Sequence, residues 1–259
     1  MVRGIDIFKR YFKQYSNNYV IIGGTACDII IEEEGFIPRT TKDIDIILIV
    51  EALSTVFAQQ FWQFIYDGEY QQREKSDGER ECFRFIKPKK LDFPYQIELF
   101  SRTPDVIVIP DEAHLTPIPV NDDLSSLSAI LLNDDYYNYV IGQSENKNGL
   151  HHAKIEALIC LKAKAYLEII DRIESGSKED AKKFKKQKAD VFRLSVMLTP
   201  ESVFDLPITI QEDINQFAAI IANDLPDKAI FKEMGVGNID PNTVFNQFMK
   251  SFQVNINGI

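Results

Sequence analysis

Residues 19–50 read YVIIGGTACDIIIEEEGFIPRTTKDIDIILIV, and this stretch decides the fold. The apolar run at 19–22 is closed by two glycines and predicts a short strand followed by a tight turn. The next residues, up to Gly35, predict a helix that ends at that glycine. Residues 42–50 are rich in β-branched side chains and alternate acid with isoleucine over their first half, which predicts a second strand with two different faces.

The two acids of the second strand, Asp43 and Asp45, stand two residues apart. In a strand this spacing directs both carboxylates to one face, about 6.6 Å apart along the backbone. Mg²⁺ is commonly held by one or two carboxylates together with substrate phosphates, so the pair is a candidate cation site. An isolated pair of this kind is more often a solvated, half-exposed strand, and the neighbouring residues therefore matter.

Three features accompany the acid pair. The turn Gly23-Gly24-Thr25 lies between a strand and a helix, where backbone N–H groups can approach phosphate oxygens. Glu98, in QIELF, is an acid between apolar residues of a predicted strand and can supply a third carboxylate. A basic, hydroxyl-rich segment leads into the acid pair and can contact a nucleotide: Arg39, Thr40, Thr41 and Lys42.

The remainder of the first half predicts more of the same sheet. Helical spacing of apolar residues is present at 5–15 and at 52–66. The segments ECFRFI and PYQIELF flank the basic turn KPKKLD and predict two antiparallel strands. Between 101 and 149 short apolar runs alternate with Pro and Asp, which favours loops and edge strands.

The pattern changes near residue 149. Helical periodicity is found at 151–174, 178–197, 210–223 and 241–252. The sequence therefore predicts an α+β protein in two domains. Residues 1–148 form a mixed sheet with flanking helices, and residues 149–259 form an all-α domain.

Composition narrows the class of protein. The chain has 259 residues, 45% of them hydrophobic and 26% charged, which is ordinary for a globular protein. Three widely spaced cysteines predict reduced thiols in a cytoplasmic protein, and the apolar runs are too short to cross a membrane. The net charge of -10 disfavours nucleic acid over most of the surface, but residues 149–199 carry 11 basic and 7 acidic side chains.

The sequence at this point resembles a known superfamily. A strand ending in Gly-Gly, a helix, a strand with Asp-x-Asp and a later strand with one acid are similar to the DNA polymerase β-like nucleotidyltransferases. More narrowly, GGTACDIIIEEEGFIPRTTKDIDIIL resembles the nucleotidyltransferases grouped with the AbiEii toxins of type IV toxin–antitoxin systems. The resemblance is specific over residues 19–50, moderate at Glu98 and looser over 151–195. The interval between the glycines and Asp43 is longer than in the group, and Glu98 stands where Asp is common.

The resemblance implies a polymerase β-like fold in the N-terminal domain and a role for particular residues. Asp43, Asp45 and Glu98 would be the catalytic metal ligands for two Mg²⁺ ions. Gly23, Gly24 and Thr25 would hold the triphosphate of an NTP. An RNA acceptor, particularly tRNA, and a cognate antitoxin are the partners that the toxin group suggests.

The helical half contains further candidates. Lys162 falls on the apolar stripe of 151–174, where it either extends past the apolar edge to water or meets the triphosphate; LKAKAYL resembles a helix of the toxin group. Asp190 and Arg193 are spaced for an ordinary i, i+3 salt bridge, which we favour over a nucleotide contact. A lysine run between 182 and 188 is either a solvated helix face or a surface for an RNA backbone.

These features together predict a Mg²⁺-dependent nucleotidyltransferase that moves a nucleoside monophosphate from NTP to an acceptor hydroxyl. The acceptor stays open, because the basic block favours RNA and the acidic remainder favours a small molecule or a protein hydroxyl. A non-catalytic module that binds a nucleotide, or a partner in a toxin–antitoxin complex, is the alternative from a different class.

Overall fold

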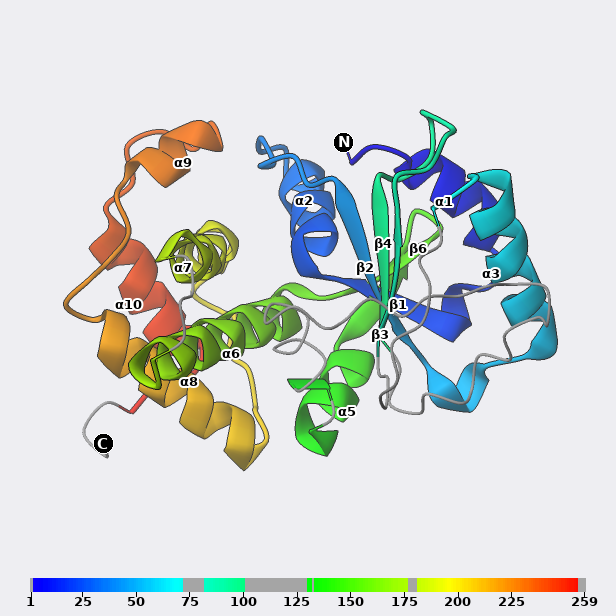
Figure 1. Cartoon of the computed structure of the whole chain (residues 1–259). Helices are drawn as coiled ribbons and strands as arrows, with labels where there is room; N and C mark the ends of the chain where they lie inside the picture. Colours follow the sequence, from blue (N-terminus) through cyan, green and yellow to red (C-terminus); the bar gives the residue numbers. More distant parts are fainter. Residues whose placement is uncertain (1, 72–81, 101–129, 132, 177–180, 256–259) are drawn as a thin grey trace. The chain divides into compact units, whose positions relative to one another are not determined.

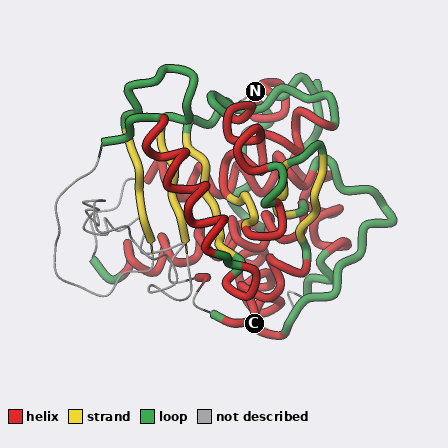
Figure 2. Tube along the Cα trace, turned by 90° about the vertical axis from the view of Figure 1, so that its right-hand side faces the viewer, coloured by secondary structure: helices red, strands yellow, loops and turns green. Residues whose placement is uncertain are grey.

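The computed structural model describes residues 2–71, 82–100, 130–131, 133–176 and 181–255 (Figure 1). The chain forms two compact units. The first comprises Met1–Asp28, Thr40–Leu132 and Ser144–Ala153, and the second comprises Ile29–Arg39, Asn133–Gln143 and Lys154–Ile259. Helices and strands can be followed along the trace in Figure 2, where helices are red and strands yellow.

The first unit is built on a mixed sheet with the strand order β3-β4-β2-β1-β6-β5. Strands β1 and β2 are antiparallel, whereas β1 with β6 and β2 with β4 are parallel. The outer pairs β3–β4 and β5–β6 are antiparallel. The strands are β1 (Tyr19–Ile22), β2 (Asp43–Leu48), β3 (Cys82–Ile86), β4 (Gln96–Phe100), β5 (Ser144–Lys147) and β6 (Leu150–Ala153).

Two helices, α1 (Ile5–Phe12) and α3 (Thr55–Asp67), contact each other beside this sheet (Figure 1). Aromatic rings pack against one another here. The ring centroids of Phe12 and Phe64 lie 5.2 Å apart, and those of Phe8 and Tyr19 of β1 lie 5.3 Å apart. Such ring contacts add to the apolar area that the helices bury. The short 3₁₀ turns η1 (Ser16–Asn18) and η2 (Val50–Ala52) complete the connections.

The second unit is largely helical. Helix α6 (Ile155–Glu174) packs against α7 (Ala181–Ser195) and α8 (Ile208–Ile221), and α7 packs against α10 (Pro241–Ser251). Phe217 of α8 is the centre of this core, with ring centroids 5.2 Å from Tyr166 and 6.0 Å from Phe248. Two shorter helices, α5 (Asp134–Gly142) and α9 (Ala229–Glu233), belong to the same unit.

Most predicted elements are confirmed, with boundaries shifted by a few residues. Helix α2 (Gly23–Glu33) follows β1 directly, and Gly35 lies after its end with φ +80°. The predicted strands around KPKKLD are the antiparallel pair β3 and β4. The part of 101–149 at residues 101–129 and 132 lies outside the described residues.

Two predictions were wrong. Residues 134–142, expected as loop or edge strand, form helix α5, because Asn133 caps its N-terminus by accepting from the N–H groups of Asp135 and Tyr136. His152, expected at the start of a helix, lies in β6 opposite Ile21 of β1, and α6 begins only at Ile155. Pairing with β1 and β5 overrides the local periodicity there.

No helix in the described part of the chain is both long and apolar enough to cross a membrane. Cys27 and Cys160 are buried thiols that form no disulfide.

Candidate functional site

The acid pair stands on β2 as its spacing predicts. Ile44 and Ile46 are buried, whereas Asp43 and Asp45 are half-buried. Because alternate side chains of a strand point to opposite faces, the two acids share one face of the sheet and the two isoleucines share the other. The strand therefore has one apolar and one acidic face, which confirms the prediction.

The apolar face is the one that α3 covers. Phe85 of β3 contacts Phe61 of α3 with ring centroids 5.6 Å apart, and it lies opposite Ile97 of β4. Alternation then places Arg84, the neighbour of Phe85, on the face away from α3. Glu98 is paired in register with Arg84 on one side and with Asp45 on the other. Arg84, Glu98 and Asp45 thus form a row of side chains across three strands. We call this row, together with Asp43 of β2, the acidic row.

The glycine turn fits closely against this row. Gly23 has φ +66°, a left-handed conformation that favours glycine, and a β-carbon added there would lie 1.8 Å from Oδ2 of Asp45. No other residue can occupy this position without moving the carboxylate. The turn also begins α2, whose first N–H groups have no partner within the helix.

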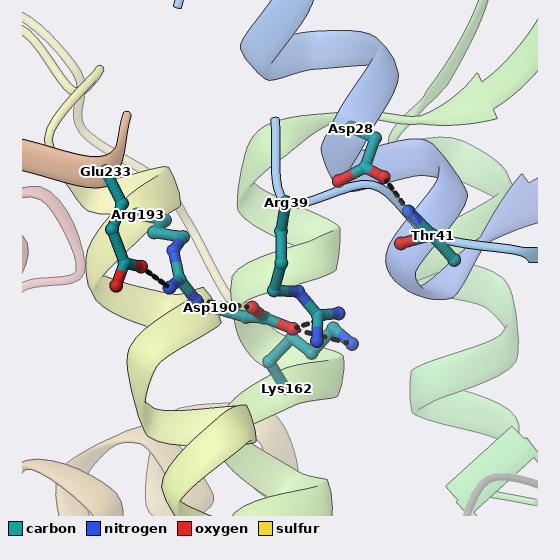
Figure 3. A network of polar contacts seen from close by, with 7 residues as sticks. All are labelled: Asp28, Arg39, Thr41, Lys162, Asp190, Arg193 and Glu233. Carbon is teal, nitrogen blue, oxygen red and sulfur yellow. Dashed lines mark hydrogen bonds and ion pairs between the residues drawn. The ribbon is translucent and has the colours of Figure 1, made fainter. Parts of the chain in front are cut away.

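Gly24 is needed for a second close approach. A β-carbon there would lie 2.7 Å from Oγ1 of Thr41, which is buried and has no hydrogen-bond partner among the described residues. The backbone N–H of Thr41 donates to Oδ2 of Asp28 at 2.6 Å, so the segment before β2 is fixed to α2 (Figure 3). Buried hydroxyl groups normally have a hydrogen-bond partner, so one without a partner is a candidate to bind a ligand or water. This hydroxyl lies beside the start of α2.

Thr25, predicted to hold a triphosphate, uses its side chain differently. It is fully buried, and its hydroxyl donates to the backbone carbonyl of Asp43 at 2.5 Å. This bond joins the first turn of α2 to β2, so the residue positions the acids relative to the turn. Only its backbone N–H could serve a ligand. Lys42, in contrast, is exposed.

Glu98 forms an ion pair with Arg84, which was not among the predicted site residues. Oε1 of Glu98 accepts from Nε of Arg84 at 2.8 Å and from Nε2 of Gln96 at 2.6 Å, and Nη2 of Arg84 lies 2.7 Å away. Burial raises the pKa of Glu98, the guanidinium of Arg84 opposes this rise, and the charge of Asp43 adds to it. Asp43 is thus close enough to act on Glu98, as is Asp45, which shares a hydrogen bond with it.

The signal for Arg84 was present in the sequence. It stands between two phenylalanines in CFRFI, just as Glu98 stands between apolar residues in QIELF. Among the residues that the structure describes, no three His, Cys, Asp or Glu side chains converge as a ready ligand set. Asp43 and Asp45 retain the predicted arrangement, while the role of Glu98 as third ligand stays a prediction.

In the second unit, Asp190 of α7 is the centre of a cluster of cations (Figure 3). Its carboxylate lies 3.4 Å from Nζ of Lys162, 3.2 Å from Nη1 of Arg193 and 3.5 Å from Nη2 of Arg39. Burial would raise the pKa of Asp190, but these cations outweigh it and hold the pKa below its usual range. The favoured i, i+3 salt bridge is confirmed, and Glu233 binds the other side of Arg193 at 3.1 Å.

Lys162 therefore does not extend to water as the ordinary explanation required, because its side chain is only 10% exposed and is paired with Asp190. Arg39, predicted as a nucleotide contact, is paired with the same carboxylate. Whether either cation binds a triphosphate stays a prediction.

The lysine run is less uniform than its sequence suggests. Lys185 and Lys186 are exposed, but Lys188 is buried, with Nζ 2.7 Å from Oδ2 of Asp224 and 2.6 Å from its carbonyl oxygen. Lys188 is thus a structural residue and was wrongly included in the polyanion surface. The side chains of Lys182 and Lys183 lie outside the described residues.

Comparison with models of known protein families finds no match to this chain, and none of the curated proteins is significantly similar to it.

Proposed function

We propose that the protein is a divalent-cation-dependent nucleotidyltransferase. The observation that carries the proposal is the contact between Gly23 and Asp45, where the start of α2 meets a carboxylate so closely that a side chain is excluded. A helix N-terminus favours phosphate, whereas a carboxylate repels it. The N-terminus of α2 and the carboxylate of Asp45 can bind one phosphate ligand together only if a cation lies between the carboxylate and the phosphate. A metal–nucleotide complex meets that requirement.

The donors on the acidic row fit a divalent cation. Asp43 and Asp45 are half-buried carboxylates on one face of β2, and hard cations such as Mg²⁺ prefer such oxygen ligands. Beside them, the buried hydroxyl of Thr41 has no partner among the described residues and can donate to a phosphate oxygen. When bound, the cation would neutralise charge on the phosphates and lower the pKa of the acceptor hydroxyl.

The chain's own groups would then orient the reaction. The first N–H groups of α2 and the Thr41 hydroxyl would hold the triphosphate, and Asp43 and Asp45 would fix its cation. The acceptor oxygen attacks the α-phosphorus, a new P–O bond forms, and the bond from the α-phosphorus to the bridging oxygen breaks to release pyrophosphate. A carboxylate of the acidic row can accept the proton that the acceptor hydroxyl loses.

The resemblance to the AbiEii-like group, which is specific over residues 19–50, supports this chemistry. It also favours an RNA 3′ end as acceptor. In addition, the exposed Lys185 and Lys186 supply positive charge in the helical unit of an otherwise acidic protein.

The proposal is tested by incubating the full chain with Mg²⁺ and each of the four NTPs labelled at the α-phosphate, together with cellular RNA, protein or a small-molecule extract. We expect one acceptor class to become labelled, with RNA as the favoured one. Mg²⁺-dependent NTP binding without transfer to any class would favour the non-catalytic nucleotide-binding alternative. Absence of both would overturn the proposal.

The glycine turn gives a direct prediction. Gly23→Ala should lower the free energy of unfolding by about 1–2 kcal/mol, because of its left-handed φ, and should weaken Mg²⁺-dependent NTP binding at least about tenfold by displacing Asp45. Gly35→Ala is the matched control, since Gly35 also has a positive φ, +80°, but a β-carbon there meets nothing within 4 Å. Denaturant unfolding and equilibrium NTP binding would measure both effects. Equal NTP affinities of Gly23→Ala and Gly35→Ala would contradict the prediction that displacing Asp45 weakens NTP binding.

The RNA acceptor gives a second prediction. Replacing Lys182, Lys183 and Lys185 of α7 by Gln should weaken RNA binding across sequences and reduce its salt dependence by up to about three counterions. The control variant replaces three exposed lysines of the same unit and so loses the same charge: Lys228, Lys232 and Lys250. RNA binding measured between low and high salt separates the two sets. If both sets change affinity equally, α7 is a solvated face and a small-molecule or protein acceptor is favoured.

A further inference from the structure

Asp28 of α2 is a buried acid of the first unit that lies outside the acidic row, and its side chain is only 3% exposed. Its Oδ2 accepts the backbone N–H of Thr41 at 2.6 Å (Figure 3). Gly24 and Asp28 are four residues apart in α2, so they lie on the same face of the helix, one turn apart. This face therefore contacts Thr41 twice, with Gly24 against its side chain and Asp28 on its backbone.

The residue before Thr41 has a strained backbone. Thr40 has φ +66°, in the left-handed region that a β-branched residue rarely adopts. Such a conformation persists only where the surrounding structure holds it, and it is typical of binding and catalytic sites. The hydrogen bond to Asp28 holds Thr40 in this way, because it fixes the peptide unit that follows Thr40.

The group that this contact places is the Thr41 hydroxyl. Its Oγ1 lies so close to Gly24 that a β-carbon there would be 2.7 Å away, and it has no hydrogen-bond partner among the described residues. A separate bond, from the Thr25 hydroxyl to the carbonyl oxygen of Asp43, joins α2 to β2. The bond of Thr25 thus fixes the strand that has the acids, whereas the bond of Asp28 fixes the residue that has the hydroxyl.

We propose that Asp28 is a positioning residue for the nucleotide triphosphate. It holds the strained turn at Thr40, so that the Thr41 hydroxyl stays at the start of α2 and can donate to a phosphate oxygen. The inference rests on the proposed function and deepens it, because nucleotide affinity then depends on a carboxylate that does not touch the nucleotide. Cation binding by Asp43 and Asp45 does not depend on Asp28.

The test measures two affinities of the full chain, one for Mn²⁺ alone and one for the Mg²⁺ complexes of the four NTPs. Asp28→Ala should weaken NTP binding about tenfold, the loss of one hydrogen bond to a charged group, and leave Mn²⁺ affinity within about twofold of wild type. Asp28→Asn keeps an oxygen that can accept from Thr41 and should bind NTP within about threefold of wild type. Adding Thr40→Gly to Asp28→Ala should recover at least about threefold in NTP affinity, since glycine adopts a left-handed φ without strain.

A double-mutant cycle shows whether Asp28 acts through the hydroxyl. Thr41→Val removes the hydroxyl but keeps the N–H that donates to Asp28, and it should weaken NTP binding about tenfold. The double variant Asp28→Ala/Thr41→Val should then bind NTP within about threefold of Thr41→Val alone. An additive loss of about a hundredfold would mean that Asp28 acts independently of the hydroxyl, which overturns the inference.

Asp67→Ala is the matched control. Asp67 of α3 is an acid of the same unit and also accepts a hydrogen bond from another helix, from the Tyr11 hydroxyl at 2.5 Å, but α3 covers the face of the sheet away from the acidic row. Its NTP and Mn²⁺ affinities should equal those of the wild type. If Asp28→Ala changes NTP affinity no more than Asp67→Ala, or weakens Mn²⁺ binding as much as NTP binding, Asp28 is only a structural residue.

A variant that keeps the carboxylate covers the case in which Asp28→Ala does not fold. Asp28→Glu displaces the carboxylate by one methylene and should weaken NTP binding at least about threefold while Mn²⁺ affinity is unchanged. Wild-type NTP affinity in Asp28→Glu would overturn the inference.

Failure of the proposed function gives a different result. Asp45→Asn should weaken both Mn²⁺ and NTP binding at least about tenfold, and wild-type affinities in this variant would overturn the proposed function itself. If Asp45→Asn loses both affinities while Asp28→Ala and Thr41→Val bind NTP like the wild type, only the role of Asp28 is overturned.

Discussion

Asp45→Asn is expected to lower nucleotidyl transfer at least about 1,000-fold, because a bound metal ion contributes several kcal/mol of transition-state stabilisation. The variant should fold normally. Asp45 is half-buried on the face of β2 opposite the buried Ile44 and Ile46, and asparagine has nearly the same shape, so the change leaves the apolar core intact. Single-turnover transfer from a labelled NTP and thermal unfolding without metal would measure the two effects.

The control for this variant is Asp6→Asn, which makes the same chemical change at an exposed position in the first turn of α1. It should retain wild-type transfer. Near-normal transfer by Asp45→Asn would show that the acidic row does not hold the catalytic cation. Unfolding of Asp45→Asn would instead identify Asp45 as a structural acid.

Asp190→Asn is expected to lower the free energy of unfolding by about 3–5 kcal/mol, because breaking a buried ion pair leaves its partner charges unpaired. Asp190 is 4% exposed, and the side chains of Lys162 and Arg193 are each 10% exposed. Glu233→Gln is the matched control, since it removes an acid that is 67% exposed from the same Arg193. That change should cost about 1 kcal/mol or less.

Two measurements test the explanation. The double variant Asp190→Asn/Lys162→Met should recover part of the lost stability in urea, because it removes a buried cation together with its partner. If Asp190→Asn costs no more than Glu233→Gln, the cluster is screened by solvent and does not stabilise the unit.

The pH dependence of the same variant has a definite sign. The pKa of Asp190 is lower in the folded protein than in the unfolded chain, so its stabilising effect is fully present above the unfolded pKa. The effect is lost as the pH falls through the folded pKa. The difference in unfolding free energy between wild type and Asp190→Asn should therefore be constant near neutrality and decrease below about pH 4.

Local chemistry was sufficient to predict the centre of the first unit. The glycine turn, helix α2 and the alternating acids of β2 follow from residues 19–50, because backbone freedom at glycine and the two-residue period of a strand are properties of the chain itself. The same holds for the long helices α6, α7, α8 and α10, whose apolar periodicity is visible over many turns.

Local patterns failed where a neighbour far along the chain decides the conformation. His152 is part of a strand because β1 and β5 lie on either side of it, and no short-range signal encodes that pairing. Helix α5 is an exception, since its Asn133 cap and the two acids that follow it are local signals in the sequence. The alternation of short apolar runs with Pro and Asp predicted loops and edge strands there instead.

Residue identity alone marked the acids at Asp43, Asp45 and Glu98 and the cations at Lys162 and the lysine run. Which charges neutralise one another was decided only by the tertiary structure. Register across three strands joins Glu98 to Arg84, and helix packing places Lys162 on Asp190 and Lys188 on Asp224. The physical reason is that an ion pair depends on the distance between two charges in space, and for residues 14 to 36 positions apart the packed fold, not the sequence interval, sets that distance.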